Sequence, residues 1–326
     1  MKKFEEIRNS IYSIERRTEI TKEIRNKYKI DVRFVGIPLA KQEALAKVLL
    51  QSLEKLSLYF EKNNYLLNPS GKMKIIFAPH KPYDPMAKGE YKSREDALYL
   101  YGQNPNILAH ELFHAIDFQC ARSLGLEKGV LLSDYIFILS RSKDPNIYEF
   151  SQALADTFTG EDVDRLKEMF SDLMHRSMNY DDVYFGKSRY NCLPSEIMAR
   201  TFEACVEENF KDQAKLKNLF LYSDENIHHH SHSAENSGIN RFPTDEELKY
   251  IVPTIENTIE RVSYLNIRKK HDWFNYMVET ANRYFEEHKY PLAVGGTPVH
   301  VKHVVGRNEN GSLKYLKGDR DDLEMF

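Results

Sequence analysis

The most constraining feature of this chain is a short apolar segment that contains two histidines four residues apart. Residues 108–117 read Leu-Ala-His-Glu-Leu-Phe-His-Ala-Ile-Asp. On a helix, residues four apart lie on one face, so the imidazoles of His110 and His114 can reach the same metal ion. The apolar flanks predict burial, which is costly for two histidines and a glutamate without polar partners. A metal ion would satisfy all three, and Glu111 lies where it can take a proton from metal-bound water.

Two histidines leave a hydrolytic zinc site short of one protein ligand, so a third ligand is expected downstream. Residues 194–206 predict a mostly buried helix, because proline suits a first helical turn and apolar residues follow it. Glu196, Arg200 and Glu203 fall on one face of this helix. Glu196 is the first candidate for the third ligand, and Glu203 and Asp117 are the alternatives. A purely structural Glu–Arg pair, four residues apart, would give the same pattern.

Together these motifs resemble the zincin-like domain of the first type of large polyvalent protein-associated domains, which occur in phage and mobile-element proteins. The matching stretches are His110–Asp117, Tyr190–Glu203 and, more weakly, Arg241–Glu247. The resemblance spans about residues 70–260. The chain is also similar to gluzincins in general. It implies a metallopeptidase fold in which Glu196 is the third ligand and Tyr190 faces the metal. The linker Asn191–Leu193 departs from the more polar, aromatic-containing linker expected for the family.

These residues predict metal-assisted hydrolysis of a peptide bond in a protein or peptide substrate. One zinc ion per chain would be held by His110, His114 and Glu196. Glu111 would serve as general base, and Tyr190 would donate a hydrogen bond to the developing oxyanion. Three further residues are expected around the ligands: Asp117, Arg200 and Glu203. We expect Asp117 and Arg200 to pair with each other or to orient the histidines.

Two other classes of function are compatible with the same motifs. One is an interaction or regulatory module of a mobile element or phage that keeps a zincin fold without turnover. The other is a toxin or defence effector whose protease acts on one host protein. A structural metal site needs the histidines but not Glu111, so the complete motif favours a catalyst.

Composition sets the outer limits. The chain has 326 residues, of which 41% are hydrophobic and 29% charged, as expected of a soluble protein with one large or two ordinary domains. The net charge of −3 does not indicate a nucleic-acid partner. Three scattered cysteines do not form a disulfide framework. Without an apolar signal core, or a run of about 18 apolar residues, the chain is expected to be cytoplasmic and not to enter a membrane.

The fold class expected is α+β. It consists of a zincin-like metalloprotease core, with a small twisted sheet, the histidine helix and the glutamate helix, and of helical additions. Residues 1–65 are expected to be an N-terminal segment of helices and a strand that packs on the core. Residues 66–260 would form the catalytic domain with a helical insertion, and residues 261–326 a C-terminal helix and β-hairpin.

Four expectations concern the surroundings of the site and one nearby tract. Residues 97–101 predict a strand, either an edge strand beside the metal cleft that could pair with an extended peptide, or an ordinary internal strand. The proline-containing loop at residues 79–91 would rim the cleft. The insertion between the two motif helices could form a wall or a lid. A histidine-rich tract, His228–His232, predicts a mobile loop and could bind additional metal ions.

Overall fold

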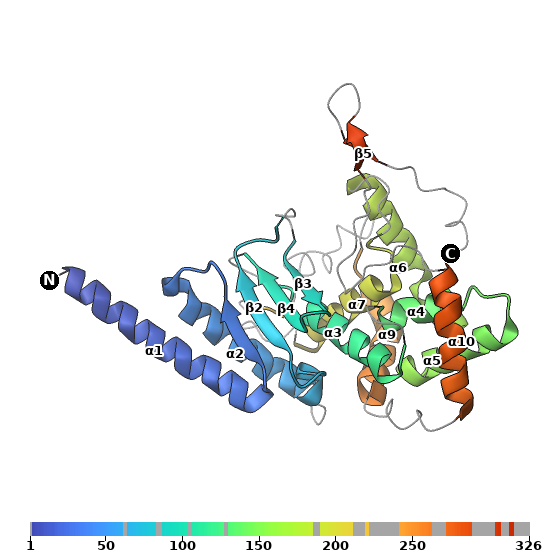
Figure 1. Ribbon diagram of the computed structural model, residues 1–326, viewed down its shortest axis with the longest axis horizontal. Coiled ribbons are helices and arrows are strands. Elements are labelled where there is room, and N and C mark those ends of the chain that lie inside the picture. Colours follow the sequence, from blue (N-terminus) through green and yellow to red (C-terminus); the bar gives the residue numbers. More distant parts are fainter. Residues whose placement is uncertain are drawn as a thin grey trace.

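The computed structural model describes residues 2–60, 64–82, 87–102, 106–126, 130–184, 190–210, 219–221, 241–262, 272–288, 304–307 and 313–315. The chain is mostly helical and contains a small mixed sheet of four strands, so the expected α+β class is confirmed at this level. Figure 1 shows an elongated molecule, with the first two helices at one end, the sheet beside them and most of the later helices at the other end.

The chain begins with two long helices on one side of the sheet. Helix α1 (Lys2–Tyr28) leads into strand β1 (Asp31–Phe34), and helix α2 (Leu39–Phe60) follows. Helix α2 packs along α1, and its leucines at positions 45, 49, 53 and 56 are buried. Their spacing of three and four places them on one face, as the sequence predicts. A short 3₁₀ helix, η1 (Asn64–Leu67), then leads to the second strand.

The sheet has the strand order β1-β2-β4-β3. Strands β1, β2 (Lys74–Ala78) and β4 (Ala97–Tyr101) run parallel, and β3 (Gly89–Lys92) runs antiparallel to β4. Strand β4 is therefore internal, which is the second of the two alternatives left open for residues 97–101. The edge beside β4 is formed by β3, most of which lies in the segment expected to be a loop. Its sequence, Gly-Glu-Tyr-Lys, carries little strand signal, and it forms because β4 has a second side to pair.

Strand β4 leads to the histidine helix α3 (Leu108–Ser123), and the glutamate helix α7 (Pro194–Phe210) packs against it. The ring of Phe113 on α3 lies 5.3 Å from that of Phe202 on α7. Between them in sequence come α4 (Leu132–Leu139), α5 (Pro145–Thr159) and α6 (Val163–Tyr184). All eight residues of α4 are buried, and it contacts both α3 and α7. This part of the insertion is an inner wall and not a lid.

The remaining described elements complete the helical end of the molecule. Helix α9 (Asp245–Arg261) starts with a capping box, since Thr244 and Glu247 each bond the other's backbone N–H. Helix α10 (Asp272–His288) packs on α4 and α5. Strands β5 (Val304–Arg307) and β6 (Leu313–Tyr315) pair antiparallel, which confirms the predicted hairpin. The tract His228–His232 lies outside the described residues.

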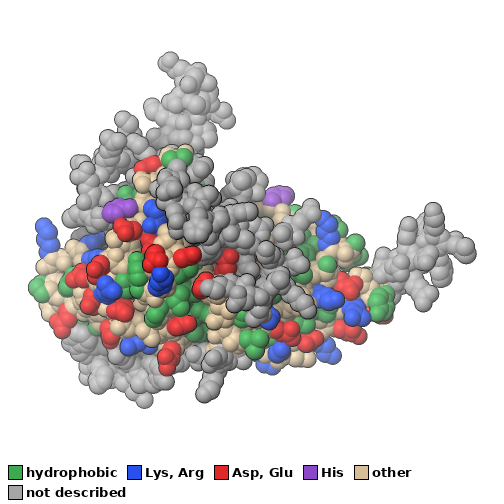
Figure 2. Space-filling model, turned by 180° about the vertical axis from the view of Figure 1, so that it is seen from behind, with side chains coloured by type: hydrophobic (Ala, Val, Ile, Leu, Met, Phe, Trp, Pro, Cys, Tyr) green, Lys and Arg blue, Asp and Glu red, His purple; other side chains and the backbone are tan. Residues whose placement is uncertain are grey.

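Three general features of the chain bear on the expectations above. Among the described helices, none has the length and apolar composition needed to span a bilayer. Figure 2 shows one face of the molecule, on which Lys and Arg side chains are interspersed with Asp and Glu side chains. Cys120, Cys192 and Cys205 are buried free thiols, as their scattered positions indicate.

Candidate metal centre

Helix α3 presents both histidines of the motif toward the same point. Thirteen of its 16 residues are buried, including His110, Glu111 and His114. The two imidazole rings lie 4.8 Å apart between centroids, and their Nε2 atoms are 3.2 Å apart. This is the arrangement expected of residues four apart on one helical face. The apolar residues between and beside them fix α3 in the core, so the rings are held in a dry environment.

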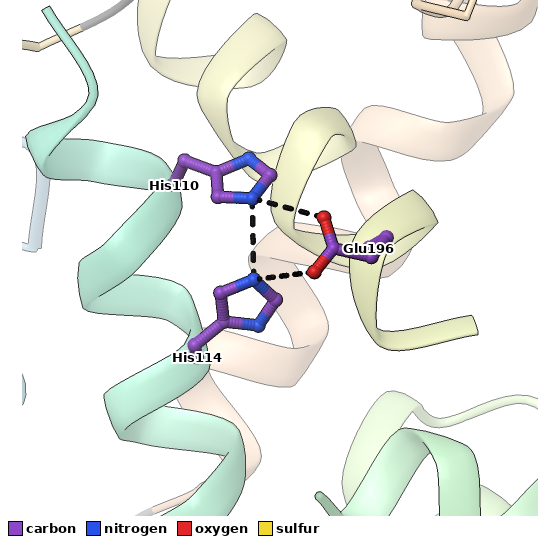
Figure 3. Close-up of side chains that lie close together, drawn as sticks. All are labelled: His110, His114 and Glu196. Atoms are coloured by element: carbon purple, nitrogen blue, oxygen red, sulfur yellow. Dashed lines mark hydrogen bonds and ion pairs between the residues drawn. The ribbon is translucent and has the colours of Figure 1, made fainter. Parts of the chain in front are cut away.

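Glu196 on α7 completes the cluster. Its Oε2 lies 3.3 Å from His110 Nε2, and its Oε1 lies 3.2 Å from His114 Nε2 (Figure 3). The three side chains are buried, and each offers one potential ligand atom within 4.8 Å of the others. Ligand atoms about 2.0–2.1 Å from a tetrahedral zinc ion are about 3.3 Å from one another, as geometry requires. The two Nε2 atoms, 3.2 Å apart, are therefore spaced as ligands of one tetrahedral cation would be, and the carboxylate presents one oxygen to each of them.

The electrostatics of the cluster favour a charged carboxylate beside the imidazoles. Burial alone would raise the pKa of Glu196, but His114 and His110 outweigh burial and hold the pKa well below its ordinary value. Burial alone would lower the pKa of His110, but Glu196 and Glu203 raise it to about 10. An anionic ligand is thus present next to two nitrogen donors. Two imidazoles and one carboxylate are a donor set that suits zinc.

Glu203 lies behind the first histidine and not at the ligand position. Its Oε2 is 3.5 Å from His110 Nδ1, on the opposite side of the ring from Glu196. A carboxylate at this nitrogen can fix the tautomer and orientation of a ligating histidine. The Nδ1 atom of His114 is buried and has no hydrogen-bond partner among the described residues. Of the three alternatives for the third ligand, the structure brings only Glu196 to both Nε2 atoms.

Glu111 and Tyr190 also reach the site. Glu111 is buried, and burial raises its pKa against the opposing effect of the two histidines. An ideal Cβ built on Gly89 of β3 would lie 2.9 Å from Glu111 Cγ, so the edge strand packs closely on this glutamate. Burial, followed by the carboxylates of Glu196 and Glu111, raises the pKa of Tyr190 well above its ordinary value. The tyrosine is half-buried and lies at the start of the turn before α7.

Asp117 and Arg200 do not pair, so that part of the expectation is wrong. Asp117 is fully buried and accepts hydrogen bonds from the backbone N–H of Ser133, at 3.0 Å, and from its hydroxyl. Its carboxylate therefore faces α4 and not the histidines. The physical reason is that the first turn of α4 has unsatisfied backbone N–H groups, which attract a carboxylate.

Arg200 instead joins α7 to the turn before it. Its Nη2 donates to the carbonyl of Asn191 and to Ser177 Oγ, and its Nε donates to the carbonyl of Arg241 at 2.9 Å. Its Nη1 is 3.9 Å from Glu196 Oε2, so the Glu–Arg pair also exists. Burial lowers the pKa of Arg200 to about 10, and Glu196 opposes this effect. The arginine thus stabilises both the ligand and the turn that carries Tyr190.

Sequence reasoning missed several residues that build the site. Asn191 was considered only as a departure in a linker, yet it accepts from Arg200 and donates to Asp181. Ser133 and Asp134 lie in an otherwise apolar segment, residues 131–139. Two adjacent polar residues at the start of such a buried segment were the available signal. No sequence pattern indicates that Gly89 lies beside Glu111, because this contact arises only when β3 pairs with β4.

Comparison with known proteins adds one finding. Residues 186–264 match the family model described as Large polyvalent protein-associated domain 1. The match includes Tyr190, Glu196 and the segment at Arg241, but the histidine helix lies outside it. It is therefore narrower than the span of residues 70–260 that the motifs indicate. No curated protein and no solved structure matches the chain.

Proposed function

We propose that this chain is a zinc-dependent metallopeptidase with a zincin-like, gluzincin-type core that binds one zinc ion. The observation that carries the proposal is the buried convergence of two Nε2 atoms and one carboxylate at 3.2–3.3 Å, with Glu111 on the same helix. His110, His114 and Glu196 would hold the metal. A zinc ion bound there would supply Lewis acidity and lower the pKa of a water molecule toward neutrality.

The protein's own residues would carry the proton transfers. Burial makes Glu111 a stronger base than an exposed glutamate, because its pKa is raised. Glu111 would take the proton of the attacking water and pass it to the leaving amine. The hydroxyl of Tyr190, which stays protonated at neutral pH, would donate a hydrogen bond to the substrate oxyanion. Glu203 would orient His110, and Arg200 would hold Glu196 and the turn at Asn191.

The substrate class proposed is a protein or peptide. Strand β3 pairs with β4 on one side and is the last described strand at this edge of the sheet. Its Gly89 packs against Glu111, so an extended peptide that pairs with β3 would pass beside the proposed base. The match to Large polyvalent protein-associated domain 1 supports an origin in a phage or mobile element. The same match would also fit a binding module without turnover.

The experiment that tests the site is the zinc content of purified variants. Wild-type protein should contain about one zinc per chain, and His110→Ala and Glu196→Gln should each lose it. Glu203→Gln should still bind one zinc per chain, but about 10–100-fold more weakly, because replacing a group that orients a metal ligand lowers the metal affinity. Replacing the four histidines at positions 228, 229, 230 and 232 should leave this zinc in place. Zinc retained by Glu196→Gln but lost from Glu203→Gln would show that the ligand is assigned incorrectly.

A further inference from the structure

Helix α4 connects the two helices that carry the proposed ligands. It starts at Leu132, and Leu131 before it provides no side-chain cap. Asp117 of α3 takes this place: it accepts from the backbone N–H of Ser133 at 3.0 Å and from the Ser133 hydroxyl. A carboxylate at the N-terminus of a helix satisfies free N–H groups and complements the helix dipole. Asp117 lies three residues after His114, so this cap is tied to the histidine helix.

The same arrangement recurs one helix later. Asp134 of α4 accepts from the backbone N–H of Ser195 at 3.0 Å and from its hydroxyl at 2.8 Å. Ser195 is the second residue of α7, just as Ser133 is the second residue of α4. Glu196 comes immediately after it. The two carboxylate–serine contacts therefore run in series from the histidine helix, through α4, to the ligand on the glutamate helix.

All four side chains of this connection are buried and lie among apolar residues. Hydrogen bonds in such a buried environment are stronger than those at a surface. They therefore restrict how far α7 can shift along α3. Metal ligands must be placed within a few tenths of an ångström, so small displacements of one helix weaken binding. Direct packing of α3 on α7 sets the approximate distance, and the two contacts at the helix ends set the position of Glu196.

We infer that Ser133, Asp134 and Ser195 are positioning residues that set the metal affinity of the site through α4. The inference rests on the proposed function, since it assumes that His110, His114 and Glu196 bind zinc. It assigns to the insertion between the motif helices a role in building the metal site. These residues touch neither substrate nor metal and act only through the placement of α7 relative to α3.

The test compares Ser133→Ala and Ser195→Ala with a matched control, Ser151→Ala. Ser151 is fully buried and donates to the carbonyl of Ile136 at 2.7 Å, so it joins α5 to α4 without reaching α3 or α7. For each variant, three quantities are measured: the free energy of unfolding of the metal-free protein, the zinc Kd by competition with a chelator, and the visible absorption of the cobalt(II) form. All three variants should lower the stability of the metal-free protein to a similar extent.

Only Ser133→Ala and Ser195→Ala should raise the zinc Kd, by about 10–100-fold, and change the cobalt spectrum. The control should stay within about twofold of wild type, as expected of a site that is not coupled to the metal. Because the two contacts act in series, the double variant should raise the Kd by less than the product of the single effects. A general loss of stability would not produce this pattern.

Two results would overturn the inference. One is wild-type zinc affinity and an unchanged cobalt spectrum in Ser133→Ala and Ser195→Ala. The other is an equal loss of affinity in Ser151→Ala. Either result, with zinc bound normally by the wild type, leaves the proposed function in place. If the wild-type protein binds no zinc, the proposed function fails and the inference fails with it.

Discussion

Individual carboxylates around the site differ in their pKa because their partners differ. Glu196 faces two imidazoles, which hold its pKa well below the ordinary value despite burial. Burial, with the nearby carboxylates of Asp117 and Glu196, raises the pKa of Asp134 to about 7, against the hydrogen bonds from the N–H and hydroxyl of Ser195. The first case could be predicted from the sequence, because the two motifs together place Glu196 beside His110 and His114. The second could not, because no motif marks Ser195 as the partner of Asp134.

The raised pKa of Asp134 gives a prediction about stability and pH. An unfolded aspartate has a pKa of about 3.9, so the folded state binds this proton more tightly. The stabilisation is complete below that value and is lost as the pH rises through about 7. Asparagine cannot ionise and escapes this loss. We expect the free energy of unfolding of Asp134→Asn, relative to wild type, to increase by about 1–3 kcal/mol between pH 5 and pH 8.

Urea unfolding of both metal-free proteins at several pH values measures this difference. A difference that stays constant across the range would contradict the raised pKa.

Secondary-structure elements with a strong apolar pattern could be predicted from the sequence. A strand that forms only because a neighbouring strand is free to pair with it could not. Strand β4 and helices α3 and α7 lie where the sequence indicates. Strand β3 was missed, and with it the identity of the sheet edge. A residue in β3 also contributes to the site: a Cβ on Gly89 would lie 2.5 Å from Ile107 Cγ2 and 2.9 Å from Glu111 Cγ.

Gly89→Ala tests the contact between the edge strand and the proposed base. Because the added methyl group is too close to two side chains, it should cost about 1–3 kcal/mol of stability and displace Glu111. We expect zinc to remain bound. Peptide hydrolysis should fall about tenfold or more, because a misplaced catalytic group slows the reaction. Gly71→Ala is the control: its φ of +73° makes alanine strained, but a Cβ there meets no atom within 4 Å. It should lower stability without changing hydrolysis per folded molecule, and equal losses of hydrolysis in both variants would refute the contact.

At the scale of the whole molecule, the proposed zinc joins two parts of the chain that lie far apart in sequence. The ligands come from α3 and α7, and the insertion α4–α6 lies between them. The presence of both motifs predicts that these two helices meet at the metal. The arrangement of the insertion, in which α4 is buried against both helices, depends on tertiary packing and could not be predicted.

Zinc should therefore stabilise the entire fold. A ligand at about 1,000 times its Kd adds about 4 kcal/mol, which for a chain of this size raises the Tm by about 5–10 °C. Removing zinc with a chelator should lower the Tm of the wild type by this amount. In Glu196→Gln the chelator should have no effect. A wild-type Tm that does not change when zinc is removed would show that the metal does not join the two helices.

The central claim is that the metal centre hydrolyses peptide bonds with Glu111 as the base. The most direct measurement compares wild type with Glu111→Gln, which keeps the size of the side chain but cannot accept the proton. Zinc content is determined for both, and newly formed protein termini are labelled and identified in the cell that produces each one. We predict full zinc in both proteins and a loss of cleavage of about 10²–10⁴-fold in the variant. Equal cleavage, or an unchanged cellular phenotype in a variant that retains zinc, would contradict the claim.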